Sequence, residues 1–117
     1  SAAVDLTAGR AGALEFSVDL VLENDWGSGS LFNVVIRNLS GETATGWRLA
    51  IDLPFDITDI WSARVEADRG ERVTIAGEAW NASIPPGGTV TFGFVGDGGA
   101  IDLEGLKNAA DVEIMLQ

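Results

Sequence analysis

The sequence predicts an all-β fold, an antiparallel β-sandwich of the immunoglobulin-like type built as a single domain, and three observations support this prediction. First, apolar residues recur at every second position along most of the chain, which is the period of a strand with one buried face. Second, clusters of glycine, proline, asparagine and serine separate these runs. Third, a length of 117 residues suits one core, since a chain of this size buries roughly two thirds of its unfolded surface.

Seven runs have the composition of strands, and the first of them alternates Phe16, Val18 and Leu20 with polar residues. The predicted strands cover 14–22, 32–37, 47–53, 57–61, 72–76, 89–95 and 112–116. Turn sequences at 27–29, 38–41, 68–70, 85–88 and 96–99 lie between them. Residues 103–108 have the pattern of one helical turn, but the segment is short and contains Gly105, so we expect it to contribute little. Residues 1–12 are rich in alanine and glycine and predict a tail or linker remnant, which leaves 13–117 as the domain.

The charge of the chain excludes several classes of partner. Eighteen acidic and seven basic residues give a net charge of −11. Such a surface repels nucleic acid and anionic lipid, because affinity for a phosphate backbone rests on lysine and arginine. No apolar run approaches the roughly 20 residues of a membrane span. The chain has no cysteine and no histidine, so it offers no disulfide or thiolate, and nothing in it indicates a cofactor. A neutral partner fits this surface best.

The four tryptophans are the strongest functional signal. Trp26 and Trp80 lie in polar, loop-like surroundings, and Trp61 directly follows Ile60, so a strand that turns Ile60 inward turns Trp61 to solvent. Trp47 instead opens an alternating strand and is predicted to be buried. Exposed large aromatic side chains mark contact surfaces in soluble proteins. A flat indole also suits stacking on the apolar face of a sugar ring.

Four segments together resemble the family 2 carbohydrate-binding modules, which anchor bacterial polysaccharide-degrading enzymes to cellulose or chitin. The segments are Asn24-Asp25-Trp26-Gly27-Ser28-Gly29 with Phe32-Asn33-Val34, then Gly46-Trp47-Arg48-Leu49 with Asp52-Leu53-Pro54, then Ile60-Trp61-Ser62, and then Ala79-Trp80-Asn81-Ala82-Ser83-Ile84-Pro85-Pro86-Gly87-Gly88 with Phe92-Gly93-Phe94. They follow the order and spacing of the family and cover most of the chain.

The resemblance implies a β-sandwich in which Trp47 is a core residue and three rings form one flat platform for polysaccharide: Trp26, Trp61 and Trp80. It also implies that the amides of Asn24, Asn33 and Asn81 bond to sugar hydroxyls, although all three could equally be turn residues that bond to their own backbone. Xylan-binding relatives carry an arginine that props up the first ring, and here that position is Gly29. The similarity therefore points to flat, crystalline cellulose or chitin, and to a secreted module of a larger polysaccharide-active enzyme.

The chain departs from the family in three respects. Members commonly join their termini by a disulfide, which this chain cannot form. Val95 stands where an asparagine is frequent, so one polar contact is lost. The sequence after Gly96 is shorter and more acidic than is usual for the family.

Two other classes of function remain as alternatives. A glycosidase would need two carboxylates about 5 to 10 Å apart, and the pairs Asp56 with Asp59 or Glu15 with Asp19 qualify only as chance matches in so acidic a chain. Ser62 and Ser83 have no visible activating base, so we predict no catalytic activity. The second alternative is an acidic adhesion or calcium-stabilised domain without sugar binding. Its candidate oxygen donors are Asp97 and Asp102, whose spacing matches no defined calcium loop.

Overall fold

Nine strands and one short helix form the part of the protein that the computed structural model describes, residues 2–6 and 16–116. The strands are β1 (Ala2–Asp5), β2 (Phe16–Asp25), β3 (Ser30–Asn38), β4 (Ala44–Asp52), β5 (Ile57–Trp61), β6 (Ala63–Arg69), β7 (Arg72–Gly77), β8 (Thr89–Gly96) and β9 (Ala110–Leu116). The helix α1 covers Leu103–Asn108. None of the helical structure in this part of the chain has the length and apolar character that a membrane crossing requires.

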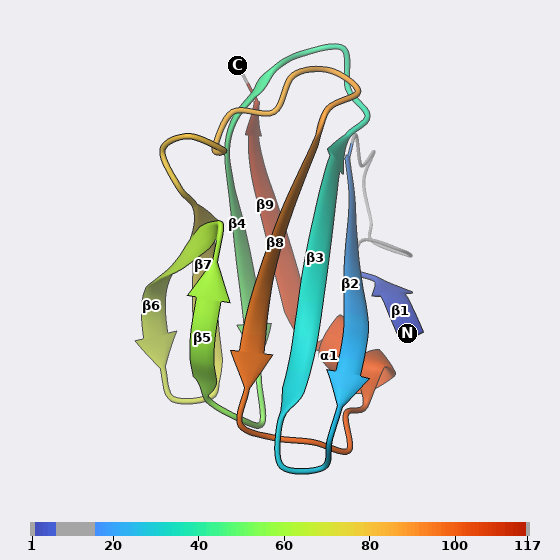
Figure 1. Ribbon diagram of the computed structural model, residues 1–117. Coiled ribbons are helices and arrows are strands. Elements are labelled where there is room, and N and C mark those ends of the chain that lie inside the picture. Colours follow the sequence, from blue (N-terminus) through green and yellow to red (C-terminus); the bar gives the residue numbers. More distant parts are fainter. Residues whose placement is uncertain (1, 7–15, 117) are drawn as a thin grey trace.

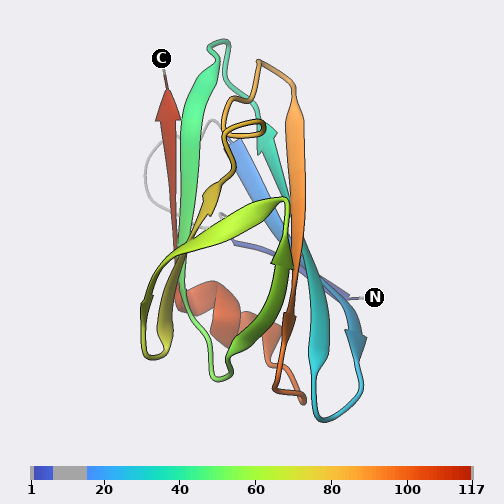
Figure 2. The same cartoon turned by 60° about the vertical axis from the view of Figure 1, so that its left-hand side comes forward.

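The strands form two antiparallel sheets that face each other (Figures 1 and 2). The five-stranded sheet has the order β1-β2-β3-β8-β5, and the four-stranded sheet has the order β6-β7-β4-β9. The chain crosses from one sheet to the other between β5 and β6, where Ser62 adopts a φ of 62°. Helix α1 lies at the lower end of the sandwich in Figure 1. The predicted all-β sandwich is therefore confirmed.

The core follows from the alternation along the strands. Phe32, Val34 and Ile36 on β3 are buried, while the residues between them face the outside of the five-stranded sheet. Aromatic rings stack at the centre: Trp47 lies 5.1 Å from Phe92 between ring centroids, and Phe32 lies 4.9 Å from Phe94. Trp47 is 1% exposed. Its predicted place in the core is confirmed.

The N-terminal segment differs from the tail predicted for residues 1–12. Strand β1 pairs with β2, placing Val4 opposite Leu20, and Leu6 is fully buried. Two apolar side chains that reach the core stabilise this short strand, even though alanine and glycine dominate the surrounding sequence. The rest of that prediction, residues 7–12, lies outside the described residues, as does the start of the strand predicted from residue 14.

Strand β6 was not predicted from the sequence, and helix α1 contributes more than its sequence suggested. Most of β6 is exposed at a sheet edge, so it has no buried stripe; it is held by pairing with β7 and by an ion pair of 2.7 Å between Arg48 and Glu66. Helix α1 forms although we expected little from its sequence. The side chain of Asp102 caps its first turn by accepting a hydrogen bond from the Gly105 amide at 3.2 Å, and Leu106 is buried.

Candidate functional site

Three of the four tryptophans are the large exposed aromatic side chains of the described surface. Trp26 is 51% exposed, Trp61 is 40% exposed and Trp80 is 73% exposed. Since an indole is costly to leave in water, three such residues in one small domain indicate a contact surface. Their exposure agrees with the expectation from the sequence.

Trp61 is held by the outer face of the five-stranded sheet. It ends β5 and pairs directly with Gly93 of β8, which in turn pairs with Asn33 of β3. Residues that pair directly in antiparallel strands share a face, so Asn33, Gly93 and Trp61 form one row across the outside of the sheet. A Cβ atom at Gly93 would lie 2.5 Å from Cε2 and 2.7 Å from Nε1 of Trp61. The indole therefore lies directly over the backbone of Gly93.

Trp26 is held in the tight turn between β2 and β3. Its amide donates to the carbonyl oxygen of Gly29 at 3.0 Å, and Gly27 takes a φ of +88°, which favours glycine. A Cβ atom at Gly29 would come within 2.5 Å of Cζ2 and 2.7 Å of Nε1 of the indole. The ring thus lies against the turn at the position where Gly29 has no side chain.

The carboxylate of Asp25 joins this turn to the segment after β8. One carboxylate oxygen accepts from the amide of Gly27 at 3.0 Å, and the other accepts from the amide of Ile101 at 3.1 Å. These backbone hydrogen bonds favour the charged form and lower the pKa of Asp25 below its usual value. The hydroxyl of Ser30 adds a hydrogen bond of 2.8 Å to the carbonyl of Gly98. The sequence did not point to Asp25 as the residue that fixes this turn.

Trp80 lies in the connection between β7 and β8, which runs upward beside the sandwich in Figure 1. The next residue, Asn81, is 5% exposed. Its side-chain amide donates to the carbonyl oxygen of Ser62 at 2.5 Å, and its backbone carbonyl accepts from Nε1 of the core Trp47 at 3.2 Å. Asn81 therefore fastens the loop of Trp80 to the residue that follows Trp61.

The three asparagines expected beside the rings occupy different environments. Asn33 is half-buried on the outer face, and Asn24 is exposed because a bulge between Leu22 and Asn24 turns it onto the same face as Leu31. Asn81 differs from the expectation, since its side chain lies below the surface and its Oδ1 atom is buried without a hydrogen bond among the described residues. Burial follows from its contacts with two other segments, which the sequence alone does not show.

Two of the acidic residues considered as alternatives accept hydrogen bonds from backbone amides. Oδ1 of Asp97 accepts from the amide of Asp56 at 2.8 Å, and Asp102 caps α1. Asp19 has a raised pKa because of burial first and then the nearby charge of Asp5. Glu15 lies outside the described residues. Across residues 2–6 and 16–116, no three acidic side chains gather into a group that could hold a metal ion.

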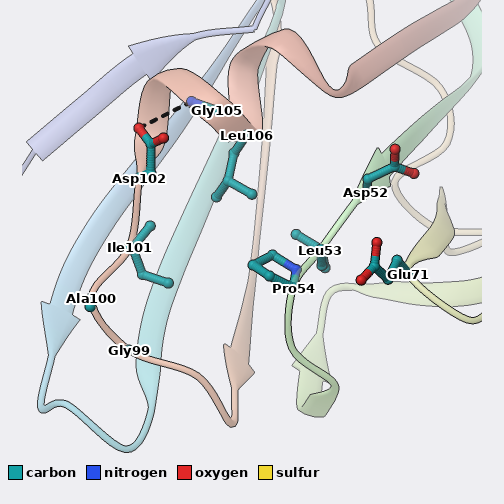
Figure 3. Close-up of a pocket in the computed structure, with 10 residues that line it drawn as sticks. All are labelled: Asp52, Leu53, Pro54, Glu71, Gly99, Ala100, Ile101, Asp102, Gly105 and Leu106. Carbon is teal, nitrogen blue, oxygen red and sulfur yellow. Dashed lines mark hydrogen bonds between the residues drawn. The ribbon is translucent and has the colours of Figure 1, made fainter.

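One cavity of about 320 Å³ lies at the end of the sandwich near α1. Figure 3 shows the apolar side chains of Leu53, Pro54, Ile101 and Leu106 on its walls. None of the four tryptophans lines it. The acidic groups on its rim include Asp102, whose carboxylate already caps the helix. The cavity is thus separate from the residues expected to bind a ligand.

Comparison with known proteins finds one matching family and several similar polysaccharide-degrading enzymes. The profile described as the cellulose binding domain matches residues 16–108. Endoglucanase E-5 of Thermobifida fusca is 33% identical over 95 residues, which cover 80% of this chain and 20% of that protein. Chitinase C of Streptomyces lividans is 28% identical over 97 residues, covering 81% of this chain and 16% of the chitinase. The chain therefore spans a fifth or less of these two relatives.

A solved structure shares the architecture as well. The chitin-binding domain of a Streptomyces coelicolor chitinase superimposes with a TM-score of 0.63 at 27% sequence identity. The match covers 76% of this chain and 86% of that domain. This chain is thus similar to nearly the full length of a binding domain whose structure was solved on its own.

Proposed function

This chain belongs to the cellulose-binding domain family, and from that membership we propose that it is a non-catalytic module that adsorbs to insoluble β-1,4-linked polysaccharide. The ligand class is cellulose or chitin. The contact residues are Trp26, Trp61 and Trp80, whose rings stack on the faces of successive sugar units. Domains named for binding cellulose and for binding chitin both occur among its similar proteins.

One observation carries the proposal: two exposed indoles pack closely against glycines. Trp26 lies against Gly29 and Trp61 lies against Gly93, and about half of each side chain stays exposed. We propose that each ring rests on the protein with one face and offers the other face to a ligand. A ring in this orientation matches a flat polymer surface better than an upright ring does. No charged group is needed for the contact, which suits a neutral polysaccharide and a protein of net charge −11.

The asparagines support the rings in two ways. Asn33 shares the row of Trp61 on the outer face, and Asn24 stands exposed next to the turn of Trp26. We assign to both the hydrogen bonds with sugar hydroxyls. Asn81 holds the segments of Trp61 and Trp80 together through the Ser62 carbonyl, so we assign to it the support of the rings in place of a direct sugar contact.

The non-catalytic part of the proposal rests on the similarity to binding domains. The candidate calcium donors Asp97 and Asp102 already accept hydrogen bonds from backbone amides. The relatives named endoglucanase and chitinase are about five times longer than the matched segment or more. We therefore propose that the module is secreted as part of a larger polysaccharide-active enzyme and brings the catalytic domain to its substrate.

Sedimentation with insoluble polysaccharide tests the proposal directly. The protein is mixed with microcrystalline cellulose, chitin or insoluble xylan at low and at high salt, and the unbound fraction is measured. We expect retention on cellulose, chitin or both, with little change on adding salt, because stacking on neutral rings is not screened. The control variant Leu39→Ala removes an apolar side chain that is 58% exposed elsewhere on the surface. No retention on cellulose and chitin, or retention that disappears with salt, contradicts the proposal.

A further inference from the structure

Gly93 lies on the outer face of the five-stranded sheet, on the strand next to the edge strand β5. Strand β8 lies between β3 and β5 (Figure 1), and Gly93 pairs with Asn33 on one side and with Trp61 on the other. The residues two positions away on β8, Thr91 and Val95, carry side chains on this same face. Gly93 therefore leaves a gap between two side chains on the outer face of β8.

The indole of Trp61 fills that gap. A Cβ atom at Gly93 would approach three ring atoms, Cζ2 most closely, then Cε2 at 2.5 Å and Nε1 at 2.7 Å. Real Cβ atoms essentially never come within 3.0 Å of another heavy atom of this kind. The neighbour that would have to move is the rigid ring itself, which has no flexible end to bend away.

We propose that Gly93 is the specificity-determining residue that holds the Trp61 ring flat across β8, with its outer face toward the ligand. The inference rests on the proposed function and deepens it, since it names what orients one of the three rings of the same site. A ring in this position extends from β5 toward Asn33 of β3, so the indole and the amide border one continuous patch. Any side chain at position 93 raises the ring and presents its edge in place of its face.

Gly93 is the counterpart of Gly29 on a different element. Gly29 orients Trp26 within a turn, whereas Gly93 orients Trp61 on a regular strand, where glycine is otherwise unfavourable. An aromatic side chain packed across the strand on a glycine compensates for the missing side chain. The same residue thus serves both the stability of β8 and the presentation of the ring.

The test compares Gly93→Ala with Gly46→Ala, a matched control on β4 of the other sheet. A Cβ at Gly46 meets the flexible end of Met115, with Cε at 2.5 Å, and Gly46 lies in the opposite sheet from Trp61. On the polysaccharide that retains the parent, we expect Gly93→Ala to weaken adsorption about tenfold, on the scale of one lost ring face, and Gly46→Ala to change it less than about twofold. In a Trp61→Ala background, Gly93→Ala should have no further effect.

Equal adsorption by folded Gly93→Ala and the parent overturns the inference, as does a Gly93→Ala effect that persists without the Trp61 ring. NMR spectroscopy supplies a readout that does not depend on adsorption. The ring current of Trp61 should shift the Hα protons of Gly93 in the parent, and this shift should vanish in Trp61→Ala. If the parent shows the shift but binds no polysaccharide, the proposed function fails while the ring placement holds. An unshifted Gly93 in the parent overturns the placement, whether or not Gly93→Ala folds.

Discussion

Replacing Trp80 by alanine separates ligand contact from folding more clearly than any other single change. Trp80 is 73% exposed, so about 180 Å² of an indole residue of roughly 250 Å² faces solvent. A sugar stacked on one face covers about 100 Å², which at ~25 cal/mol per Å² corresponds to ~2.5 kcal/mol. The loss of that contact lowers affinity by roughly 60-fold, since ~1.4 kcal/mol corresponds to a factor of ten.

The same substitution should leave the stability of the fold nearly unchanged. Little of the Trp80 side chain is buried, and area-based estimates of burial are upper limits. Trp47→Ala is the matched contrast, because this ring is 1% exposed and stacks on Phe92. Its removal leaves a cavity in the core and should cost about 3 to 5 kcal/mol. Adsorption isotherms on cellulose or chitin, together with urea unfolding of both variants, measure the two effects.

The result that refutes this reasoning is a loss of stability by Trp80→Ala comparable to that of Trp47→Ala. Such an outcome would place the ring in the core of the protein in solution. A folded Trp80→Ala that adsorbs with less than about a threefold loss would also refute it, because even half of the expected contact gives a larger change.

Three further predictions concern the groups that hold the rings. Gly29→Arg should displace the Trp26 ring, which lies 2.5 Å from the position of a Cβ, and weaken adsorption to crystalline polysaccharide at least several-fold without unfolding; unchanged isotherms would show that ring orientation is unimportant. Asn81→Ala should reduce stability by about 1 to 3 kcal/mol and adsorption together, since it frees the buried contact with Ser62; full stability with weak adsorption in a urea titration would instead indicate a direct sugar contact. The pKa of Asp25 is lowered in the folded state from 3.8, so its charge stabilises the fold above that pH and the stabilisation is lost as the pH falls through the lowered pKa. Melting temperatures of Asp25→Asn should therefore depend less on acid pH than those of the parent, and parallel profiles would contradict this.

The alternating strands could be predicted from the sequence because each has one buried face. The buried positions of β3 and β4, such as Val34 and Leu49, follow the expected period of two. The exposure of Trp61 followed from the same rule, since its neighbour Ile60 packs against the core. The two loop tryptophans were recognisable because glycine, serine and asparagine surround them.

The remaining features depend on contacts that are distant in sequence. Strand β6 carries charges such as Arg64 and Glu66 at an edge, where backbone pairing holds the strand and no apolar stripe is required. The burial of Asn81 arises because Ser62, 19 residues away, supplies an acceptor. The contact between Gly93 and Trp61 likewise requires the register of β5 with β8, which no local pattern specifies.

The unequal exposure of the three tryptophans has a consequence for the entropy of binding. Trp61 is packed across β8 and Trp26 is packed on its own turn, so the rotamers of both are restricted before a ligand arrives. Trp80 has nearly three quarters of its surface in water, so we expect its side chain to keep the most rotational freedom of the three. Immobilising a free side chain costs about 0.5 to 1.5 kcal/mol, and this cost falls mainly on Trp80. Raising the affinity of this domain is therefore a matter of restricting one ring, whereas the other two are already preorganised.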